Sequence, residues 1–327
     1  MTNKNSEYLS IQTTQNLKGI FAIIIIIGHL KQYTPALINN LFGNFLSIWA
    51  YLIVGGFFFF SGYGLLLQYR NRGNQYIRTF PVRRLLTLYL SCLIIQIPYV
   101  VAHFCTLPFS IEYLIKVFLI PGYAIGSGWY IQSIFFLYLL FYLFFLCFPK
   151  VNRILVFLII TVIYTVLSIV FNSLLWYQSV FAFFLGAIWA EYKNKIDAVT
   201  ESTKNYVISL LTSAVIFAAT LLLGNANSIE DSWYSILAKC ISVIAFVVLV
   251  LLILKKICIN NPVFAFLGKI SLELYCIHIF FLSVFRGLIN NEILFWTISI
   301  VSSIAGAFVL NVIISFALSF LNKKKSG

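Results

Sequence analysis

Long apolar runs separated by short polar connections extend along almost the whole chain. Runs of about twenty apolar residues are long enough to cross the hydrocarbon core of a bilayer as helices. The pattern therefore predicts an all-α, polytopic membrane bundle of about ten transmembrane helices. Together they form one integral membrane domain over residues 1–327, and we expect no soluble domain at either end. The expected spans are residues 17–37, 45–69, 84–105, 129–148, 154–172, 175–191, 206–223, 233–254, 263–285 and 293–321.

The composition excludes an ordinary soluble domain. Hydrophobic residues make up 61% of the chain and charged residues only 9%, whereas soluble proteins have roughly 25% charged residues. The first apolar run lacks a small-residue cleavage site, so we expect it to stay in the bundle and not to be removed as a signal peptide. The cysteines fall mostly inside spans and show no metal-ligand spacing, so we expect neither a disulfide framework nor a metal site. They are Cys92, Cys105, Cys147, Cys240, Cys258 and Cys276.

The chain has 22 basic and 9 acidic residues, an excess that is also found in nucleic-acid-binding proteins. Here the basic side chains lie in alternate short loops, which is typical of membrane topology and not of a nucleic-acid patch. With the N-terminus inside, the outer connections carry little positive charge beyond Lys31 and Lys116, and one of them carries Glu230 and Asp231. We therefore predict that both termini are cytoplasmic. The basic residues placed inside are Arg70, Arg72, Arg78, Arg83, Arg84, Lys150, Arg153, Lys193, Lys195, Lys204, Lys255, Lys256, Lys323, Lys324 and Lys325.

The first span holds two ionisable residues, Lys18 at its start and His29 inside it. At about 100° and 1.5 Å per residue, both project from one face of a helix and lie roughly 16 Å apart. Lys18 is then at the membrane surface and His29 near mid-depth. An ionisable residue inside a span is a functional-site hypothesis, because its burial is costly. Two structural explanations stay open: His29 can bond to a neighbouring helix, and Lys18 can extend to the lipid headgroups.

Small and basic residues mark the second and third spans. Ser61 and Gly62 follow four phenylalanines, and small residues let helix backbones approach closely. We expect a helix contact or a local unwinding there, as plain packing or as the lining of a site. Arg83 and Arg84 open the third span at the cytoplasmic surface. The positive-inside rule alone explains these arginines, but guanidinium groups near an intramembrane histidine also suit a phosphate-bearing donor. The piece 111–120 is too short to cross the bilayer and is expected in the interface.

The ninth span contains a second group of polar residues. Ser271, Tyr275 and His278 follow i, i+4, i+7 spacing and share one helix face. Glu273 lies roughly 140° from His278 around the helix, so it is no obvious partner for that histidine. A partner for Glu273 on another helix is the remaining possibility.

Together these residues resemble the membrane-bound acyltransferase family 3, integral-membrane O-acyltransferases that modify bacterial surface glycans and related molecules. The resemblance extends over nearly the whole chain and depends on the order of its elements. Those elements are Lys18 with His29, Phe59 to Gly62, Arg83 with Arg84, Trp129 with Tyr138, Phe183 to Gly186, and Leu267 to His278.

Two positions depart from the family pattern. The family usually has Arg where this chain has Lys18, and a Lys keeps the charge but loses the bidentate geometry; variants with Lys look like a subgroup that includes sugar O-acetyltransferases. Leu86 and Thr87 stand where a second Arg is common. Many relatives also carry an extracytoplasmic hydrolase-like domain after the bundle, which we do not expect here.

The resemblance implies an O-acetyltransferase of the bacterial cytoplasmic membrane. Its acyl donor would be cytoplasmic acetyl-CoA or another acyl-CoA, used as a co-substrate with no bound cofactor, and its acceptor a hydroxyl of a surface or lipid-linked glycan. A neutral His29 suits a general base, acting directly or through a relay. Lys18 is grouped with His29 as a catalytic candidate, and together with Arg83 and Arg84, the donor-binding candidates, it would hold the donor's phosphates. The candidate acceptor-binding or supporting residues are Ser61, Trp129, Ser271, Glu273, Tyr275 and His278.

A transporter or flippase is the alternative from another functional class. Intramembrane His and Lys also serve in proton relays and substrate sites. Transporter folds, however, often contain internal repeats with broken helices in corresponding positions, and the polar elements of the first and ninth spans differ in sequence. The residues therefore favour the enzyme.

Overall fold

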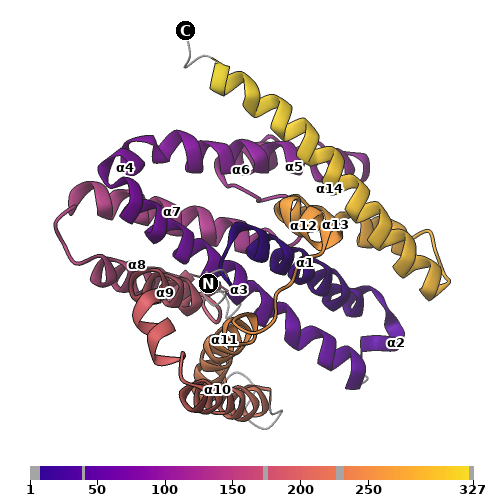
Figure 1. The fold of residues 1–327 in the computed structure, drawn as a ribbon. Helices are drawn as coiled ribbons and strands as arrows, with labels where there is room; N and C mark the ends of the chain where they lie inside the picture. The colour runs from indigo at the N-terminus through magenta and orange to yellow at the C-terminus, as the bar shows by residue number, and fades with distance from the viewer. Residues whose placement is uncertain (1–7, 39–40, 172–175, 226–231, 324–327) are drawn as a thin grey trace. The chain divides into compact units, whose positions relative to one another are not determined.

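The protein is built from α-helices (Figure 1). The computed structural model describes residues 8–38, 41–171, 176–225 and 232–323, and no strand occurs among them, which confirms the all-α class. Glu230, Asp231, Lys324 and Lys325 lie outside the described residues. The helices are α1 (Ile11–Tyr33), α2 (Pro35–Ile38), α3 (Leu41–Arg72), α4 (Asn74–Phe80), the π-helical segment η2 (Pro81–Leu86), α5 (Thr87–Thr106), α6 (Ile111–Leu119), α7 (Trp129–Cys147), α8 (Arg153–Phe171), α9 (Phe181–Val199), α10 (Thr203–Gly224), α11 (Trp233–Leu254), α12 (Pro262–Lys269), α13 (Ser271–Arg286) and α14 (Glu292–Lys323).

Eight of the described helices are long and apolar enough to cross a membrane, and a bent pair would raise the number to nine. The chain is therefore a polytopic helical bundle, with fewer clear spans than the ten expected. Even if the bent pair counts as one span, the sixth expected span, 175–191, is missing from these candidates. It is part of α9, whose C-terminal half carries four charged residues, among them Glu191 and Asp197, and these lower its hydropathy.

The ninth expected span, 263–285, is broken and not continuous. α12 and α13 meet at an angle of 79°, and Ile270 between them leaves helical geometry with φ −101° and ψ 16°. α12 is held in its direction by close packing on α1, because a Cβ atom on Gly268 would lie only 1.9 Å from the carbonyl oxygen of Gln15. The chain therefore turns at Ile270 before it continues as α13.

The third expected span begins earlier than residue 84. α4, η2 and α5 form one continuous candidate span that starts at Asn74. Pro81 has no N–H group and its ring disfavours the regular α-helical ladder, and the helix passes this point as the wider η2 segment. Such π-helical segments often occur at functional sites. Here the segment carries Arg83 and Arg84.

The chain divides into two compact units, each described here by itself. The first unit contains most of α3, with α4, α8, α9, α10, α11 and most of α7. The second contains most of α1, with η2, α5, α6, α12, α13 and α14. In residue numbers, the first unit is 1–14, 51–79 and 136–260, and the second is 15–50, 80–135 and 261–327.

Glycines allow α3 and α9 to touch through their backbones in the first unit. A Cβ atom on Gly62 would lie 2.0 Å from the carbonyl oxygen of Phe183, and one on Gly186 would lie 2.2 Å from that of Phe59. No larger residue fits at either crossing point without moving a helix. The helix contact expected at Gly62 is confirmed.

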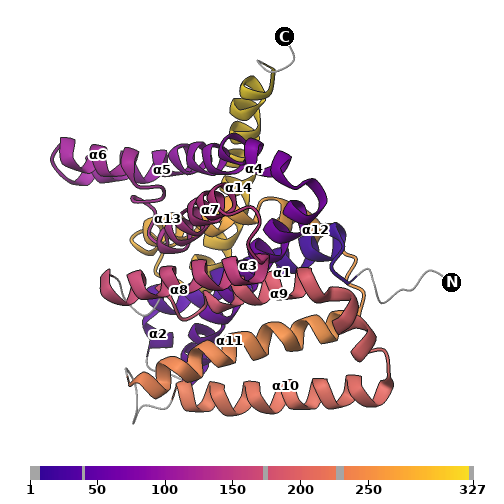
Figure 2. The ribbon, with the colours of Figure 1, turned by 90° about the vertical axis from the view of Figure 1, so that its left-hand side faces the viewer.

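The ion pairs described in the first unit gather at one end of its helices. α3 and α9 run in the same direction, because Ser179 bonds to the carbonyl oxygen of Tyr51 near one end and Arg70 bonds to that of Ala190 near the other. α10 and α11 form an antiparallel hairpin, side by side in both views (Figures 1 and 2). The ion pairs described in this unit gather at the Arg70 end, as the positive-inside rule predicts for a cytoplasmic end. They involve Arg70, Arg153, Glu191, Lys193, Asp197 and Lys255.

In the second unit, α1 is fixed at both of its ends. Near its start it crosses α12, where a Cβ atom on Gly19 would lie 2.1 Å from the carbonyl oxygen of Phe264. Just beyond its other end, Thr34 accepts a 3.0 Å hydrogen bond from the indole of Trp296 on α14. Between these points α1, α13 and α14 share an apolar cluster. Its buried members are Leu30, Leu282 and Phe295.

α6 has nine residues, and a helix of that length cannot cross a bilayer. Ile111, Ile115 and Phe118 are exposed along one face at i, i+4, i+7 spacing, while Glu112 and Lys116 form a 2.7 Å ion pair. Such an amphipathic helix suits the membrane interface. The interfacial location stays a prediction.

Two native cysteines can test the orientation of the bundle. Cys105 near the end of α5 and Cys258 after α11 are both exposed, and the charge pattern places the first outside and the second in the cytoplasm. In single-cysteine variants on intact cells, we expect an impermeant thiol reagent to label Cys105 at once and Cys258 only after permeabilisation. The opposite labelling order would show that the bundle is inserted the other way round.

Candidate active site

Two histidines from distant parts of the sequence meet in the second unit. His29 lies on α1 and His278 on α13, and their ring centroids are 4.9 Å apart at an interplanar angle of 63°. His103, the third histidine of the chain, stacks instead on Tyr113, with centroids 3.7 Å apart. Imidazole is the side chain most often used for general acid–base chemistry. A histidine pair inside a membrane bundle is therefore the strongest catalytic candidate among the described residues.

The helix backbone sets the orientation of both imidazoles. His29 Nδ1 lies 2.9 Å from the carbonyl oxygen of Ile25, and His278 Nδ1 lies 3.2 Å from that of Leu274. A carbonyl oxygen only accepts, so each Nδ1 carries a proton and donates it. In the neutral ring the lone pair is then on Nε2. Both histidines are thus arranged to accept a proton at Nε2.

The two rings differ in accessibility. His278 is completely buried, and within the described part of the chain its Nε2 has no hydrogen-bond partner. His29 is half-buried, so a substrate can reach it more easily. The geometry therefore favours His29 as the group that meets substrate and His278 as the group behind it.

A chain of aromatic rings connects the histidine pair to the start of α7. Tyr275 lies 6.0 Å from His278 between ring centroids, Tyr130 lies 5.1 Å from Tyr275, and Trp129 lies 6.3 Å from Tyr130. Tyr275 donates a 3.0 Å hydrogen bond to the carbonyl oxygen of Ser127, whose hydroxyl bonds back to the carbonyl oxygen of Tyr275 at 3.3 Å. The structure thus brings Trp129 and Tyr275 toward the pair.

Tyr99 of α5 fixes the middle of α13. Its hydroxyl donates to the carbonyl oxygen of Cys276 at 2.7 Å and accepts from the backbone N–H of Phe280 at 3.1 Å. His278 lies between these two residues on the same helix. Sequence reasoning missed Tyr99, because nothing in the pattern of the third span distinguishes it from other aromatic residues.

Glu273 has a partner on another helix, the possibility left open by its spacing. Its Oε1 accepts a 2.9 Å hydrogen bond from the side-chain amide of Asn311 on α14. The side chain is buried, and its Oε2 has no hydrogen-bond partner among the described residues. Ser271, at the start of α13, is also buried. Glu273 therefore joins α13 to α14, on a face away from the histidine pair.

Two basic residues, Lys18 and Arg84, interact near the start of α1. α1 is continuous from Ile11 to Tyr33, so Lys18 and His29 share one face and lie roughly 16 Å apart. Lys18 is half-buried, and its charge interacts electrostatically with that of Arg84 in η2. Arg83 and Arg84 are both exposed. Like charges brought close together favour an anion beside them.

Ser61 belongs to the first unit, whereas the other candidate residues belong to the second. It is half-buried next to Gly62, at the crossing of α3 and α9. That position fits a packing role, which was one of the two expectations for it.

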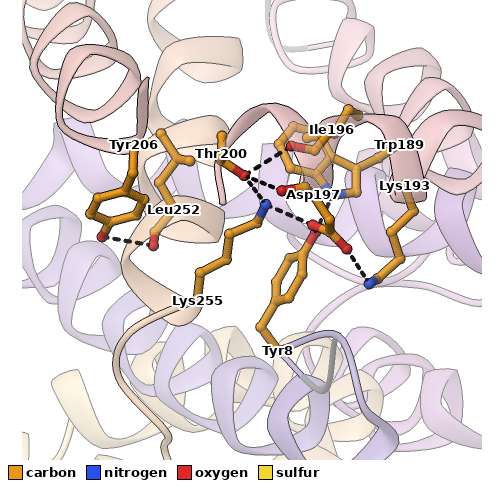
Figure 3. Close-up of polar contacts among 9 residues, drawn as sticks. All are labelled: Tyr8, Trp189, Lys193, Ile196, Asp197, Thr200, Tyr206, Leu252 and Lys255. Atoms are coloured by element: carbon orange, nitrogen blue, oxygen red, sulfur yellow. Dashed lines mark hydrogen bonds and ion pairs between the residues drawn. The ribbon is translucent and has the colours of Figure 1, made fainter. Parts of the chain in front are cut away.

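The sequence analysis also did not predict a polar cluster at the Arg70 end of the first unit (Figure 3). Asp197 accepts hydrogen bonds from Tyr8 at 3.0 Å and from the ammonium groups of Lys193 and Lys255 at 2.6 Å each. The Tyr8 hydroxyl in turn accepts a 2.8 Å bond from the indole of Trp189. Burial raises the pKa of Tyr8 well above its ordinary value, so this phenol stays protonated and donates. The cluster fastens the segment before α1 to the ends of α9 and α11.

One of three comparisons with known proteins gave a match. No curated protein and no solved structure gave a match. Residues 15–317 match the model of acyltransferase family 3, described as an acyltransferase domain. Because this match covers nearly the whole chain, the protein belongs to acyltransferase family 3 and is a multi-pass membrane acyltransferase.

Proposed function

We propose that this protein is an O-acetyltransferase that moves an acetyl group from cytoplasmic acetyl-CoA to a hydroxyl of a lipid-linked or surface glycan in the bacterial cytoplasmic membrane. The observation that carries the proposal is the histidine pair of α1 and α13, with both Nδ1 atoms held by helix carbonyls. Family membership supplies the reaction class, acyl transfer. The donor, the acceptor and the residue roles are our inference.

The donor is proposed to enter along α1. Lys18, Arg83 and Arg84 attract the phosphates of acetyl-CoA, and Arg84 adds a guanidinium fork suited to phosphate oxygens. The extended pantetheine arm separates the phosphates from the thioester, and α1 separates Lys18 from His29 by roughly 16 Å. With the phosphates at the start of α1, the thioester can therefore reach the histidine pair.

The chemical step requires a base and then an acid. As the acceptor hydroxyl attacks the thioester carbon, His29 Nε2 takes its proton and the new C–O bond forms. The C–S bond then breaks, and the imidazolium returns that proton to the thiolate, so that CoA leaves as a thiol. His278 packs against the His29 ring and holds it in position. Partial exclusion of water protects the thioester from hydrolysis.

The proposal is tested with purified protein, radiolabelled acetyl-CoA and a panel of lipid-linked and free glycans. Covalent transfer of label to a glycan hydroxyl is the expected result. Movement of an unmodified substrate across vesicles without label transfer would instead identify a transporter.

Removing a proposed phosphate contact should weaken donor binding. For Arg84→Ala we expect the KM for acetyl-CoA to rise roughly ten- to hundredfold with a smaller change in kcat, because charge-assisted hydrogen bonds contribute about 1.5–3 kcal/mol. Lys18→Arg, which keeps the charge, should retain activity. An unchanged KM together with inverted insertion of the variant would assign Arg84 to topology alone.

A further inference from the structure

A cavity of about 360 Å³ lies in the first unit, where α7 ends and α8 begins. None of its lining residues is assigned above to acyl transfer. α3, the α7–α8 connection and α9 all contribute to its walls. The lining includes Tyr69, Lys150, Asn152, Arg153, Glu191 and Tyr192.

Positive charge dominates this cavity. Glu191 pairs with Arg153 at 3.0 Å and more loosely with Arg70 at 3.9 Å. Two guanidinium groups therefore face one carboxylate. Of these groups Arg153 and Glu191 line the cavity, and Lys150 adds a second cation to the lining, so two positive charges against one negative charge leave an excess of one. Arg70 adds a further positive charge next to Glu191, outside the lining. An anion is the ligand that this excess favours.

The start of α8 also favours an anion as the ligand. α8 begins at Arg153, and the side-chain oxygen of Asn152 caps it by accepting from the N–H groups of Ile154 and Leu155 at 2.9 and 3.3 Å. The positive end of the helix dipole therefore lies beside the cavity. Helix N-termini together with basic side chains are a common way to bind phosphate.

Exposed apolar side chains precede and follow the lining residues of the α7–α8 connection in sequence. Leu146 and Phe148 at the end of α7 are each 52% exposed, and Leu155 in the first turn of α8 is 47% exposed. The α7–α8 connection joins two candidate membrane spans, so it lies at the depth of the lipid headgroups. A ligand here meets cations in the cavity and lipid-facing side chains immediately beside it.

We propose that this cavity binds the phosphodiester headgroup of an anionic phospholipid from the surrounding leaflet. Lys150 and Arg153 contact the phosphate, and the acyl chains lie along the exposed apolar side chains of α7 and α8. A soluble phosphate ester has the same charged group, but it has no acyl chains to place along these exposed apolar side chains. The first unit would thus bind a phospholipid of the membrane in which it lies.

The test measures lipid binding and needs no turnover. Native mass spectrometry of the delipidated full chain, titrated with phosphatidylglycerol or phosphatidylcholine of equal chain length, gives the affinity for each lipid. We expect tighter binding of phosphatidylglycerol. Lys150→Gln should weaken it about fivefold, since one basic residue near a membrane surface contributes about a factor of five. Lys150→Glu should weaken it further.

Lys204→Gln is the matched control, because it removes the same charge from an exposed lysine of α10 that is outside the cavity lining. It should bind phosphatidylglycerol like the wild type. Equal affinity for the two lipids, or equal loss in the Lys150 and Lys204 variants, would overturn the proposed site. Displacement of the lipid by glycerol phosphate or inorganic phosphate would show that the cavity takes soluble phosphate, and would refute the lipid assignment.

Discussion

His29→Ala should lower the turnover number for acyl transfer about 10²–10⁴-fold, the usual contribution of general-base catalysis, with little change in the KM for acetyl-CoA. The reason is geometric: His29 is the more accessible member of the pair, and its Nδ1 is already bonded to Ile25. Alanine keeps the helix but removes the lone pair at Nε2. The measurement is label transfer from radiolabelled acetyl-CoA by purified variants with matched thermal stability.

The other two histidines of the chain supply the controls. His278→Ala should reduce turnover less, because this buried ring only supports His29. His103→Ala should leave turnover unchanged, since His103 stacks on Tyr113 and not on the pair. Near-normal turnover in His29→Ala, with a severe loss in His278→Ala, would make His278 the base and would refute the proposed assignment.

Asp197→Asn should cost about 3–5 kcal/mol of stability, the usual effect of removing one partner from a buried ion pair. Lys255 is only 4% exposed at its side chain, and its ammonium group bonds to Asp197 and to Thr200. The substitution leaves this buried charge without its carboxylate. The measurement is thermal unfolding of the purified protein in detergent, and Lys255→Met in the same background should recover part of the loss.

Glu112→Gln is the matched control, because Glu112 also pairs with a lysine four residues away but is exposed. It should not change the unfolding temperature measurably. Equal effects of the two acid-to-amide substitutions would show that the Asp197 cluster is no more than a surface ion pair.

The effect of Asp197 should also depend on pH. Burial alone would raise the pKa of Asp197, but hydrogen bonds and charges from Lys193 and Lys255 hold it below its ordinary value. A carboxyl group with a lowered pKa stabilises the folded protein above the ordinary Asp pKa of about 3.9, and this contribution is lost as pH falls through the folded-state pKa. The difference between wild type and Asp197→Asn should therefore be full at neutral pH and disappear in strong acid.

The fold class and the main candidates were accessible from the sequence for a physical reason. Hydropathy over about twenty residues reports a spanning helix, and a histidine inside such a run stands out because its burial is costly. That reasoning selected His29 and His278 separately. Their contact was not predictable, because no periodicity relates two residues on different helices so far apart in the chain.

The errors also have physical causes. A hydropathy average over 263–285 does not register the bend at Ile270, because the polar residues around it, Lys269, Ser271 and Glu273, are outweighed by the apolar stretches before and after them. Tyr8 lies in a polar segment before the first span, so its burial against Trp189 and Asp197 depends on tertiary packing and has no signal in the pattern. The glycine contact between α3 and α9 was predictable only in part. Gly62 suggested that α3 touches another helix, but the sequence did not show that this helix is α9 or that Gly186 lies at the same contact.

The bend at Ile270 changes what the bilayer must accommodate around this enzyme. α13 has 16 residues, which at 1.5 Å per residue is about 24 Å, shorter than the roughly 30 Å of a hydrocarbon core. The polar backbone at the bend must then be covered by protein or water at membrane depth, or the lipid must thin locally to meet it. In either case α13 alone does not fill the thickness of the hydrocarbon core, and the remaining depth beside it is bounded by other parts of the protein, by water or by thinned lipid.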